Sequence, residues 1–449
     1  MSNFKFRIKN NTIYYGVDYL KYSLSNTINI DDFKVNINDF QLVESFINKL
    51  VVFTYHYGMN IVNNTNVTLV NHHFIDLNGI EVLIMDTVKI NRFMKVGKLP
   101  TGKKNNICDC KGVRVGHFTI HDHDYHTGVT VVSPHEGNIF KEKVVGASYT
   151  FNGFGKSIGL LQVDELGTIE SNIALTSTLN VCKIGDGVVN EALSQNPEIG
   201  ITTGTINPIC MECNDSTLNK SRDRILGRKS YYDALKVLDY DFREGDIGAG
   251  SGMICHGFKG GIGSSSRIIK VLDKEYTLGI LVNSNFGDDN GKSLILNGEY
   301  LGDKFDNIFS SLITEEKGSI IVIVATDAPF NERQIKRILK RAEIGIGRTG
   351  SYAGNGSGDV FIGFSTANKR LHFAKEIDNI EYLSDNYISP FFKGVVEGCE
   401  EAIINSMLSS HHLKGYQKEV YSLNEFNYLF SDMIDEVIEW NYQEKKNID

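Results

Sequence analysis

The sequence predicts a layered α/β protein, because short strands and helices interleave along most of the chain. Apolar runs such as "SIIVIVATDAP" (319–329) are rich in β-branched residues and end at turn residues, as buried strands do. Segments such as "NERQIKRILKRAEIG" (331–345) instead carry apolar residues at helical spacing. With 449 residues, 41% of them hydrophobic, the chain is long enough for two or three domains with a substantial core.

Residues 1–95 differ in amino-acid composition from the rest of the chain, and we interpret them as a small N-terminal α+β extension of unknown role. They are rich in Asn, Ile, Tyr and Phe and hold few glycines. We expect a helix running into a strand over 42–58, and a hairpin that turns at Asn78-Gly79. The segment 95–106 carries Gly, Pro and a charge cluster and is the expected boundary, so that 106–449 forms the main domain.

In the main domain the glycine density rises and the predicted elements alternate. Strands separated by one helix are commonly sheet neighbours, so we expect the strands at 319–329 and 359–368 to pair. The predicted helices are 186–196, 229–239, 331–345 with Asn331 as N-cap, and 389–410 with a proline near its start. The predicted strands are 116–120, 126–133, 143–153, 276–287, 319–329 and 359–368.

Composition argues against several partners. The formal net charge is −9 and no long basic run occurs, so we expect neither a nucleic-acid nor a membrane-surface partner. No stretch reaches the roughly 18 uninterrupted apolar residues of a membrane helix. The first residues lack the apolar region of a secretory signal, and seven scattered cysteines fit reduced thiols, which together predict a cytoplasmic protein.

Two clusters have the residue types of metal ligands, but their spacing argues against a metal site. Cys108 and Cys110 form a C-x-C pair, whereas Cys210 and Cys213 form a distant C-x-x-C pair, so the repeat of a zinc site is missing. The run "HDHDYH" (121–126) is more simply a polar hairpin loop. We therefore predict no metal and no cofactor.

Two glycine-rich segments require a backbone that passes close to a ligand or to another part of the chain. They are "GDIGAGSGMICHGFKGGIGSSSR" (245–267) and "GIGRTGSYAGNGSGDVFIGF" (345–364). In the second, Ser357 and Asp359 lie two residues apart at a strand edge and project to the same side. The step Gly318-Ser319 precedes five β-branched residues and, by itself, predicts only a turn before a strand.

Several long strings resemble the β-peptidyl aminopeptidases and L-aminopeptidase D-amidase/D-esterases, a family that includes nylon-oligomer hydrolases. They are "GVRVGH" (112–117), "GAGSGMICHGFKGGIGSSSR" (248–267), "GSIIVIVATDAP" (318–329) and "GIGRTGSYAGNGSGDVFIGFSTAN" (345–368), followed by the helix after Pro390. The resemblance covers about 106–420 and leaves out the first 95 residues. It implies an α-β-β-α sandwich like that of N-terminal-nucleophile hydrolases, with different connectivity.

The resemblance also implies that the chain cuts itself between Gly318 and Ser319. Ser319 would then be the N-terminal nucleophile, Ser357 and Asp359 its hydroxyl and acidic partners, and Asn285 the donor to the oxyanion. The chemistry is coherent, because the freed α-amino group has a pKa of about 7.7–8.0 and can act as general base. No histidine of a Ser-His-Asp triad is evident from the sequence.

The expected activity is hydrolysis of N-terminal residues from peptides, amides or esters through a Ser319 acyl-enzyme. Small substrates of this kind and a homo-oligomer of cleaved two-chain units are the expected partners. We also expect Asn214, Gly287 and Gly356 at the substrate-binding surface. Asn214 stands where the family often has tyrosine, and 288–290 are unusually acidic. The alternatives are an acyltransferase of related self-cleaving type, or a weakened family member acting as a scaffold.

Overall fold

The structure is a computed structural model with two compact units, and each unit is described by itself. One unit comprises Met1–Lys95 with Asn424–Asp449, and the other comprises Val96–Leu423. Described residues are 96–288, 290–305 and 316–430, together with Met94, Met433 and strands at 3–9, 12–17, 26–29, 42–43, 52–53, 72–77, 80–85, 87–93 and 435–441.

The described part of the first unit consists of strands and most of the 3-10 turn η8 (Leu423–Leu429). A five-stranded sheet has the order β3-β2-β1-β25-β8. The predicted hairpin is confirmed as β6 (His72–Leu77) paired with β7 (Ile80–Met85). Most of the helix expected within 42–58 lies outside the described residues. The other strands are β1 (Asn3–Lys9), β2 (Thr12–Val17), β3 (Asn26–Asn29), β4 (Leu42–Val43), β5 (Val52–Phe53), β8 (Thr87–Phe93) and β25 (Asp435–Asn441).

The end of the chain does not group with the main domain, which was predicted to hold everything from 106 to 449. Strand β25 pairs antiparallel with β1 on one side and with β8 on the other, so it completes the sheet of the first unit. The compact unit that holds the glycine-rich segments therefore ends at Leu423.

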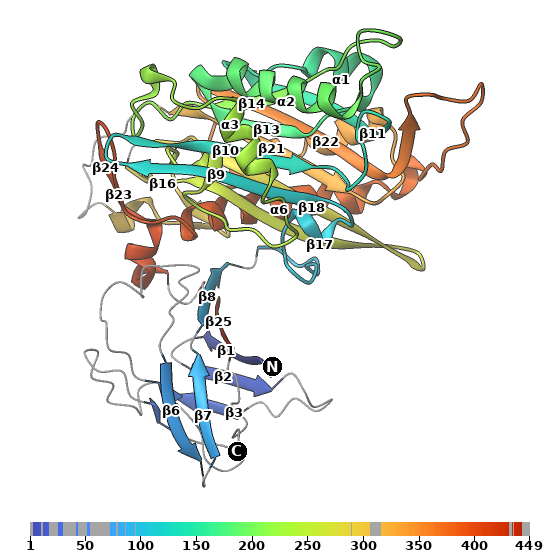
Figure 1. The fold of residues 1–449 in the computed structure, drawn as a ribbon. Helices are drawn as coiled ribbons and strands as arrows, with labels where there is room; N and C mark the ends of the chain where they lie inside the picture. The colour runs from blue at the N-terminus through green and yellow to red at the C-terminus, as the bar shows by residue number, and fades with distance from the viewer. Residues whose placement is uncertain are drawn as a thin grey trace. The chain divides into compact units, whose positions relative to one another are not determined.

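The second unit contains two stacked sheets, shown in Figure 1. The smaller has the order β14-β13-β10-β9, from β9 (Arg114–Asp122), β10 (Tyr125–Ser133), β13 (Ile173–Ser177) and β14 (Ile209–Cys213). The larger has the order β12-β11-β22-β21-β18-β17, from β11 (Glu142–Gly153), β12 (Thr168–Ile169), β17 (Gly261–Val271), β18 (Lys274–Asn285), β21 (Lys317–Thr326) and β22 (Gly356–Leu371).

The expected pairing of the two strands that flank one helix is confirmed. Strands β21 and β22 lie side by side and parallel, with Ser319 opposite Gly358. On its other edge β21 pairs antiparallel with β18. Strand β21 is thus a central strand, and its residues Ile320–Val324 are all at most 2% exposed. A continuous β-branched run is what such a two-sided burial requires.

The main core lies between the two sheets. Side chains of β9, β10, β13 and β14 meet those of β18, β21 and β22 in one apolar cluster that includes Ile173, Met211, Ile321 and Ile362. Residues of β21 alternate, so that Ile321, Ile323 and Ala325 belong to this cluster while their neighbours face the opposite side of the sheet.

Helices cover the outer faces of both sheets. Helices α2 (Val181–Gln195) and α3 (Arg228–Leu235) pack with Val129, Val131 and Ala174 of the smaller sheet. Helix α6 (Ser389–Leu408) lies against β17 and β18 of the larger sheet, as Figure 1 shows. Helices α1 (Leu160–Leu166) and α4 (Glu332–Leu339) lie against β11. A mixed α/β fold is therefore confirmed. None of the helices among the described residues has the length and apolar content needed to cross a membrane.

The helix predicted over 331–345 is divided in two. Asn331 is its N-cap as expected, since its side chain accepts a hydrogen bond of 2.9 Å from the Gln334 amide. Helix α4 ends at Leu339, and α5 (Ala342–Arg348) begins after a tight turn in which the Arg341 amide donates to the Ile338 carbonyl. The break redirects the chain so that Gly345 packs closely on Cys399 of α6.

The glycines of 245–267 serve packing inside the protein. A side chain at Gly263 would place its Cβ 1.9 Å from the Ala402 carbonyl oxygen of α6. A Cβ at Gly261 would lie 2.1 Å from the Gly245 carbonyl oxygen. The close approach predicted for this segment is therefore to helix and loop backbone. Sequence reasoning missed β13, β14 and β17, since each is either short or interrupted by glycine and serine.

Shorter elements connect the main ones. They are β15 (Ile254–Cys255), β16 (Phe258–Lys259), β19 (Ile295–Leu296), β20 (Glu299–Tyr300), β23 (Leu413–Lys414), β24 (Glu419–Val420), and the 3-10 turns η2 (Ile107–Asp109), η3 (Thr178–Asn180), η4 (Ser221–Asp223), η5 (Gly248–Gly250), η6 (Gly302–Phe305), η7 (Asp385–Tyr387) and η8 (Leu423–Leu429).

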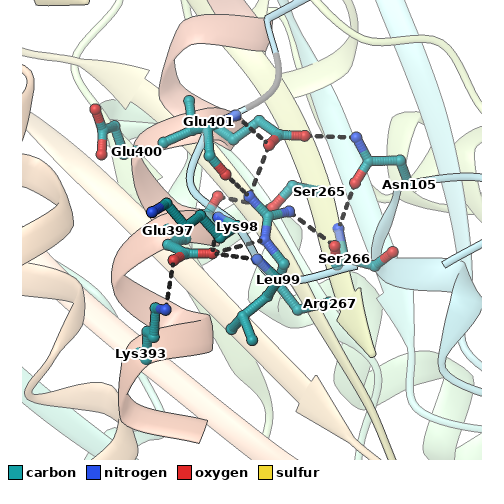
Figure 2. A network of polar contacts seen from close by, with 12 residues as sticks. Lys98, Leu99, Asn105, Ser265, Ser266, Arg267, Lys393, Glu397, Glu400 and Glu401 are labelled. Carbon is teal, nitrogen blue, oxygen red and sulfur yellow. Dashed lines mark hydrogen bonds and ion pairs between the residues drawn. The ribbon is translucent and has the colours of Figure 1, made fainter. Parts of the chain in front are cut away.

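A buried ion-pair network fastens the start of the second unit to α6 (Figure 2). Arg267 of β17 is fully buried and donates to Glu401 at 2.7 Å and to the Val96 carbonyl at 2.8 Å. Glu401 also accepts from the Val96 amide. One oxygen of Glu397 accepts from the amides of Lys98 and Leu99. The carboxylates of α6 thus satisfy both a buried cation and the polar backbone of 96–99.

We expect Arg267→Met to lower the free energy of unfolding by about 3–5 kcal/mol, because it leaves a buried carboxylate without its cation. Urea denaturation followed by circular dichroism measures this, with Ser319→Ala in every protein compared so that the chain stays in one piece. Arg228→Met is the matched control, since Arg228 pairs with Asp186 at the surface, and it should change the unfolding midpoint little. Equal midpoints for the two variants would show that the buried network does not stabilise the unit.

Candidate active site

Three adjacent strands bring most of the predicted site residues together. In the register of β18 with β21, Asn285 is opposite Ser319. In the register of β21 with β22, Gly318 is opposite Ser357, and Ile320 is opposite Asp359. The sheet itself therefore places residues far apart in sequence at one end of β21.

Gly318 has a backbone that only glycine can adopt here. Its φ is +127°, and a Cβ would lie 2.0 Å from the Asn285 carbonyl oxygen. Strand β21 already begins at Lys317, so Gly318 and Ser319 lie inside the strand. The turn that the local sequence predicted is not there. The peptide bond between these two residues instead sits in an extended chain pressed against Asn285.

Ser357 and Asp359 form a directly bonded pair. The Ser357 hydroxyl donates to Asp359 Oδ1 at 2.6 Å, and both residues are buried. Asp359 Oδ2 is buried with no hydrogen-bond partner among the described residues. Burial raises the pKa of Asp359 to about 6; the Ser357 hydroxyl opposes this shift and the charge of Glu316 adds to it. A carboxyl group with such a pKa can take up or release a proton near neutral pH.

Ser319 is buried and faces the thiol of Cys213, a residue that its sequence spacing suggested only as a metal ligand. Burial raises the pKa of the Cys213 thiol, and a hydrogen bond with the Ser319 side chain partly offsets this. Cys213 ends β14, so the smaller sheet contributes to the surroundings of Ser319. Strand β14 was not recognised from the sequence, because all five of its residues are buried and it lacks the alternation of buried and exposed positions that indicates a strand.

Asn285 is held by backbone groups on both sides. Its Oδ1 accepts from the Ile254 amide at 2.9 Å, and its Nδ2 donates to the Asn214 carbonyl at 3.1 Å. These contacts fix which side of the amide carries the donor. Since an amide nitrogen has two hydrogens, one remains for another acceptor. Asn214 thus adjoins the site through its backbone, while its exposed side chain accepts from Ser216.

The two glycines expected at the substrate surface have different surroundings. A Cβ at Gly356 would meet no atom within 4 Å, so this position has free space beside it. Gly287 has a φ of +99°, and a Cβ there would lie 2.6 Å from His256 Nδ1. Gly287 is therefore required for packing against His256. Its contact with substrate stays a prediction, as does that of Gly356.

Acidic residues near the site are largely occupied in structural contacts. Asp288 is buried and accepts from the Ser293 amide at 2.7 Å and the Ser293 hydroxyl at 2.6 Å. It therefore holds its own loop. Glu316, which no sequence pattern singled out, is 2% exposed and accepts from the Ser351 hydroxyl and the Tyr352 amide. It anchors the loop that precedes Ser357 and contributes negative charge to Asp359.

The histidines and cysteines considered as catalytic or metal-binding residues do not form a single cluster among the described residues. His256 is fully buried with Nε2 3.3 Å from the Thr349 hydroxyl, and His372 lies 2.5 Å from the Thr203 hydroxyl. His121 and His126 contact each other through their Nδ1 atoms at 3.1 Å, on the hairpin of β9 and β10. Cys108 lies in η2 and Cys110 follows that turn, Cys210 and Cys213 lie in β14, and all seven cysteines are free. Within the described part of the chain, no three of His, Cys, Asp or Glu gather as metal ligands do.

Comparison with known proteins gives consistent results. The model of peptidase family S58 matches residues 105–421. The β-peptidyl aminopeptidase BapA of Sphingosinicella xenopeptidilytica is 33% identical over 337 residues, which are 70% of this chain and 83% of that protein. The crystal structure of the PH0078 protein of Pyrococcus horikoshii OT3 matches with a TM-score of 0.71 and 45% identity, covering 75% of this chain and 96% of that one.

A further solved structure is relevant to the fold. The L-aminopeptidase D-Ala-esterase/amidase of Ochrobactrum anthropi, described as a prototype for the serine aminopeptidases and a new variant of the Ntn hydrolase fold, matches with a TM-score of 0.69 and 29% identity. The match covers 75% of this chain and 96% of that one. These findings place the chain among the hydrolases of peptides and amides, as predicted from the sequence. More narrowly, the chain belongs to peptidase family S58.

We expect the ionisation of Asp359 to lower the stability of the folded chain. Its folded-state pKa is raised, so its contribution is fully present below its unfolded pKa of about 4 and is lost as the pH rises through about 6. Relative to Asp359→Asn, the free energy of unfolding of the protein with the native Asp359 should therefore fall by about 2–3 kcal/mol between pH 4 and pH 7. Both proteins should carry Ser319→Ala, so that the chain stays in one piece.

Urea titrations at four pH values between 4 and 7 provide the measurement. Asp273→Asn in the same background is the control, because Asp273 is exposed in the turn between β17 and β18. A stability difference between the native protein and the Asp359→Asn variant that does not change over this range would contradict the raised pKa.

Proposed function

We propose that the chain cuts itself between Gly318 and Ser319 and then acts as an aminopeptidase or amidase with Ser319 as N-terminal nucleophile. The observation that carries this proposal is the position of Ser319, between Asn285 on one neighbouring strand and the Ser357–Asp359 pair on the other. A nucleophile, a proton acceptor and an amide donor thus meet at one sheet end.

In the proposed cut, the Ser319 hydroxyl oxygen attacks the carbonyl carbon of Gly318. Its proton passes to a nearby acceptor, for which the unpartnered Asp359 Oδ2 is suited by its raised pKa. The tetrahedral intermediate collapses when the Gly318–Ser319 C–N bond breaks and the nitrogen takes up a proton. Water then hydrolyses the ester, which leaves a carboxylate on Gly318 and a free amine on Ser319.

After the cut, the freed amine supplies the general base for turnover, a role it cannot have in the uncut chain, where this nitrogen belongs to a peptide bond. In each turnover it accepts the Ser319 hydroxyl proton during attack on the substrate carbonyl, and gives it to the leaving amine. Ser357 and Asp359 hold the resulting ammonium group through a hydroxyl and a carboxylate. The free hydrogen of Asn285 Nδ2 donates to the oxyanion, while the Ile254 and Asn214 backbone contacts keep the amide oriented. Water finally cleaves the acyl-enzyme.

The proposal includes the finer features predicted from the sequence. Helices on the outer faces of two stacked sheets support an α-β-β-α sandwich of N-terminal-nucleophile type. The substrates are peptides, amides or esters with a free N-terminal residue, which is the chemistry named for the relatives. A cytoplasmic homo-oligomer of cleaved two-chain units, without metal or other cofactor, completes the proposal, with 1–95 as a separate module.

We expect purified protein to show two fragments, 1–318 and 319–449, in intact mass spectra, and Ser319→Ala to remain one chain. The alanine variant removes the attacking oxygen and leaves the backbone unchanged. Ser422→Ala is the control, because it removes a buried hydroxyl that donates to the Ser410 carbonyl and leaves Ser319 in place, and it should still be cut. A full-length chain that persists in preparations releasing p-nitroaniline from aminoacyl anilides would exclude this mechanism.

We expect Asn285→Asp to lower kcat by at least about 10²–10³-fold, because it keeps the acceptor for the Ile254 amide and removes the donor. Self-cleavage should slow as well, since the same donor serves the first tetrahedral intermediate. Anilide hydrolysis by the cleaved fraction gives kcat and KM. Asn190→Asp is the matched control, because it removes a half-buried amide of α2 that donates to the Tyr232 hydroxyl, outside the candidate site. A kcat within twofold of the unsubstituted protein would remove Asn285 from the oxyanion site.

A further inference from the structure

A cavity lies at the other end of the smaller sheet from Ser319. It has a volume of about 390 Å³, within the range of about 300–1,000 Å³ typical of small-molecule sites. It is lined by the start of β9, the end of β10, the loop 135–140, the segment 170–172 that precedes β13, and the last turns of α2 and α3. None of the residues that line it belongs to the site around Ser319.

The separation from Ser319 follows from the strand register. Ile173 at the start of β13 pairs with Ile209 at the start of β14, and Cys213, which faces Ser319, ends β14. At about 3.3 Å per residue, the two strand ends are roughly 13 Å apart. Asn172, which lines the cavity, directly precedes Ile173 and lies farther still from Ser319.

Two buried acceptors form one side of the cavity. The Glu191 carboxylate is 9% exposed and accepts from the Asn172 amide, the Gln195 amide and the Tyr231 hydroxyl. All three donors are neutral, and Glu191 has no cationic partner within the described residues. Asn172 is 5% exposed, and its Oδ1 has no hydrogen-bond partner in the described structure. Because Asn172 Nδ2 donates to both oxygens of Glu191, the amide cannot be turned around.

This arrangement calls for a cationic hydrogen-bond donor. A buried carboxylate surrounded by neutral donors is stabilised by a cation, and an unpaired amide oxygen by an N–H group. Helix α2 adds to the effect, since its last turn, with Ala192 and Gln195, borders the cavity and carries the partial negative charge of a helix C-terminus. An ammonium group has three N–H bonds, so it can donate both to the carboxylate and to the amide oxygen, and its charge complements the helix C-terminus.

A cation without a partner lines the same cavity. Arg114 makes no side-chain hydrogen bond or ion pair with any described residue, and its Nε is buried. A guanidinium group binds a carboxylate in a bidentate manner. The lining is mixed, and beside its many polar residues it contains the apolar side chains of Ile139, Phe140, Val188 and Leu235.

From these contacts we propose that this cavity is a second binding site for a small molecule that carries both a primary ammonium and a carboxylate, with an apolar side chain. Free apolar amino acids and short dipeptides have this chemistry. The ammonium group contacts Glu191 and Asn172 Oδ1, the carboxylate contacts Arg114, and the side chain lies against the apolar wall. The site is independent of the reaction at Ser319.

Calorimetric titration of the full chain carrying Ser319→Ala tests the site, because this variant cannot hydrolyse the probes. L-Leucine and L-leucyl-L-leucine are the probes, and N-acetyl-L-leucine and L-leucinamide each lack one of the two charges. We expect at least one probe to bind at one site per chain. Each blocked compound should bind roughly 10- to 100-fold more weakly, as expected for loss of one hydrogen bond to a charged group.

Variants locate the binding. Arg114→Met should weaken it by a similar factor without unfolding the protein, since the Arg114 side chain has no hydrogen bond or ion pair to lose within the described residues. Arg222→Met is the matched control at an exposed arginine outside the cavity and should bind normally. Glu191→Gln should abolish binding, with circular dichroism to verify folding. The proposal is wrong if neither probe binds at millimolar concentration, if leucinamide binds as well as leucine, or if Arg114→Met leaves affinity unchanged.

Discussion

The site depends on one close approach between two backbones. Gly318 can press against Asn285 because it has no side chain and a φ of +127°. This contact lets β21 continue as a strand through residues 317–319, so that Ser319 keeps its place opposite Asn285 and Gly358. A turn at this point would carry the serine out of the sheet. The position of Ser319 is thus set by the pairing of β21 with β18 and β22, and side-chain contacts add to this.

Burial sets the chemistry that this geometry allows. Asp359 is held away from water beside Glu316, and its pKa rises to about 6 for that reason. The same carboxyl group can therefore accept a proton in one step and pair with an ammonium group in another. Cys213 closes the opposite side of Ser319 with a thiol whose pKa burial raises, so this thiol stays protonated and does not compete as a nucleophile.

Much of the fold was predictable because it rests on patterns within single segments. The apolar run 320–324, the N-cap Asn331 and the hairpin at 72–85 each have a local physical cause. Strands β13 and β14 were missed, since their burial follows from partners elsewhere in the chain. The division of the helix after Leu339 depends on its packing with α6, and the pairing of β25 with β1 and β8 joins opposite ends of the sequence. No pattern within a single segment indicates the burial of β13 and β14, the break in the helix or the pairing of β25.

The candidate site, too, could be predicted from the sequence only in part. The family resemblance placed Ser319, Ser357, Asp359 and Asn285, and the strand register brings them together. The resemblance did not indicate Cys213 or Glu316, whose part arises only when β14 and the loop before Ser357 reach the same sheet end. The acidic stretch 288–290 contains Asp288, whose carboxylate holds its own loop through Ser293, a contact that the sequence did not indicate.

The central position of β21 changes what a cut there means for the molecule as a whole. The larger sheet would take β11, β12, β17 and β18 from one product and β21 and β22 from the other. Arg267 and Glu401 would belong to different polypeptides, as would β25 and its two partner strands. Once the two pieces separate, their reunion is a bimolecular reaction whose yield depends on concentration. Folding before the proposed cut, while the chain is continuous, would avoid this dependence on concentration.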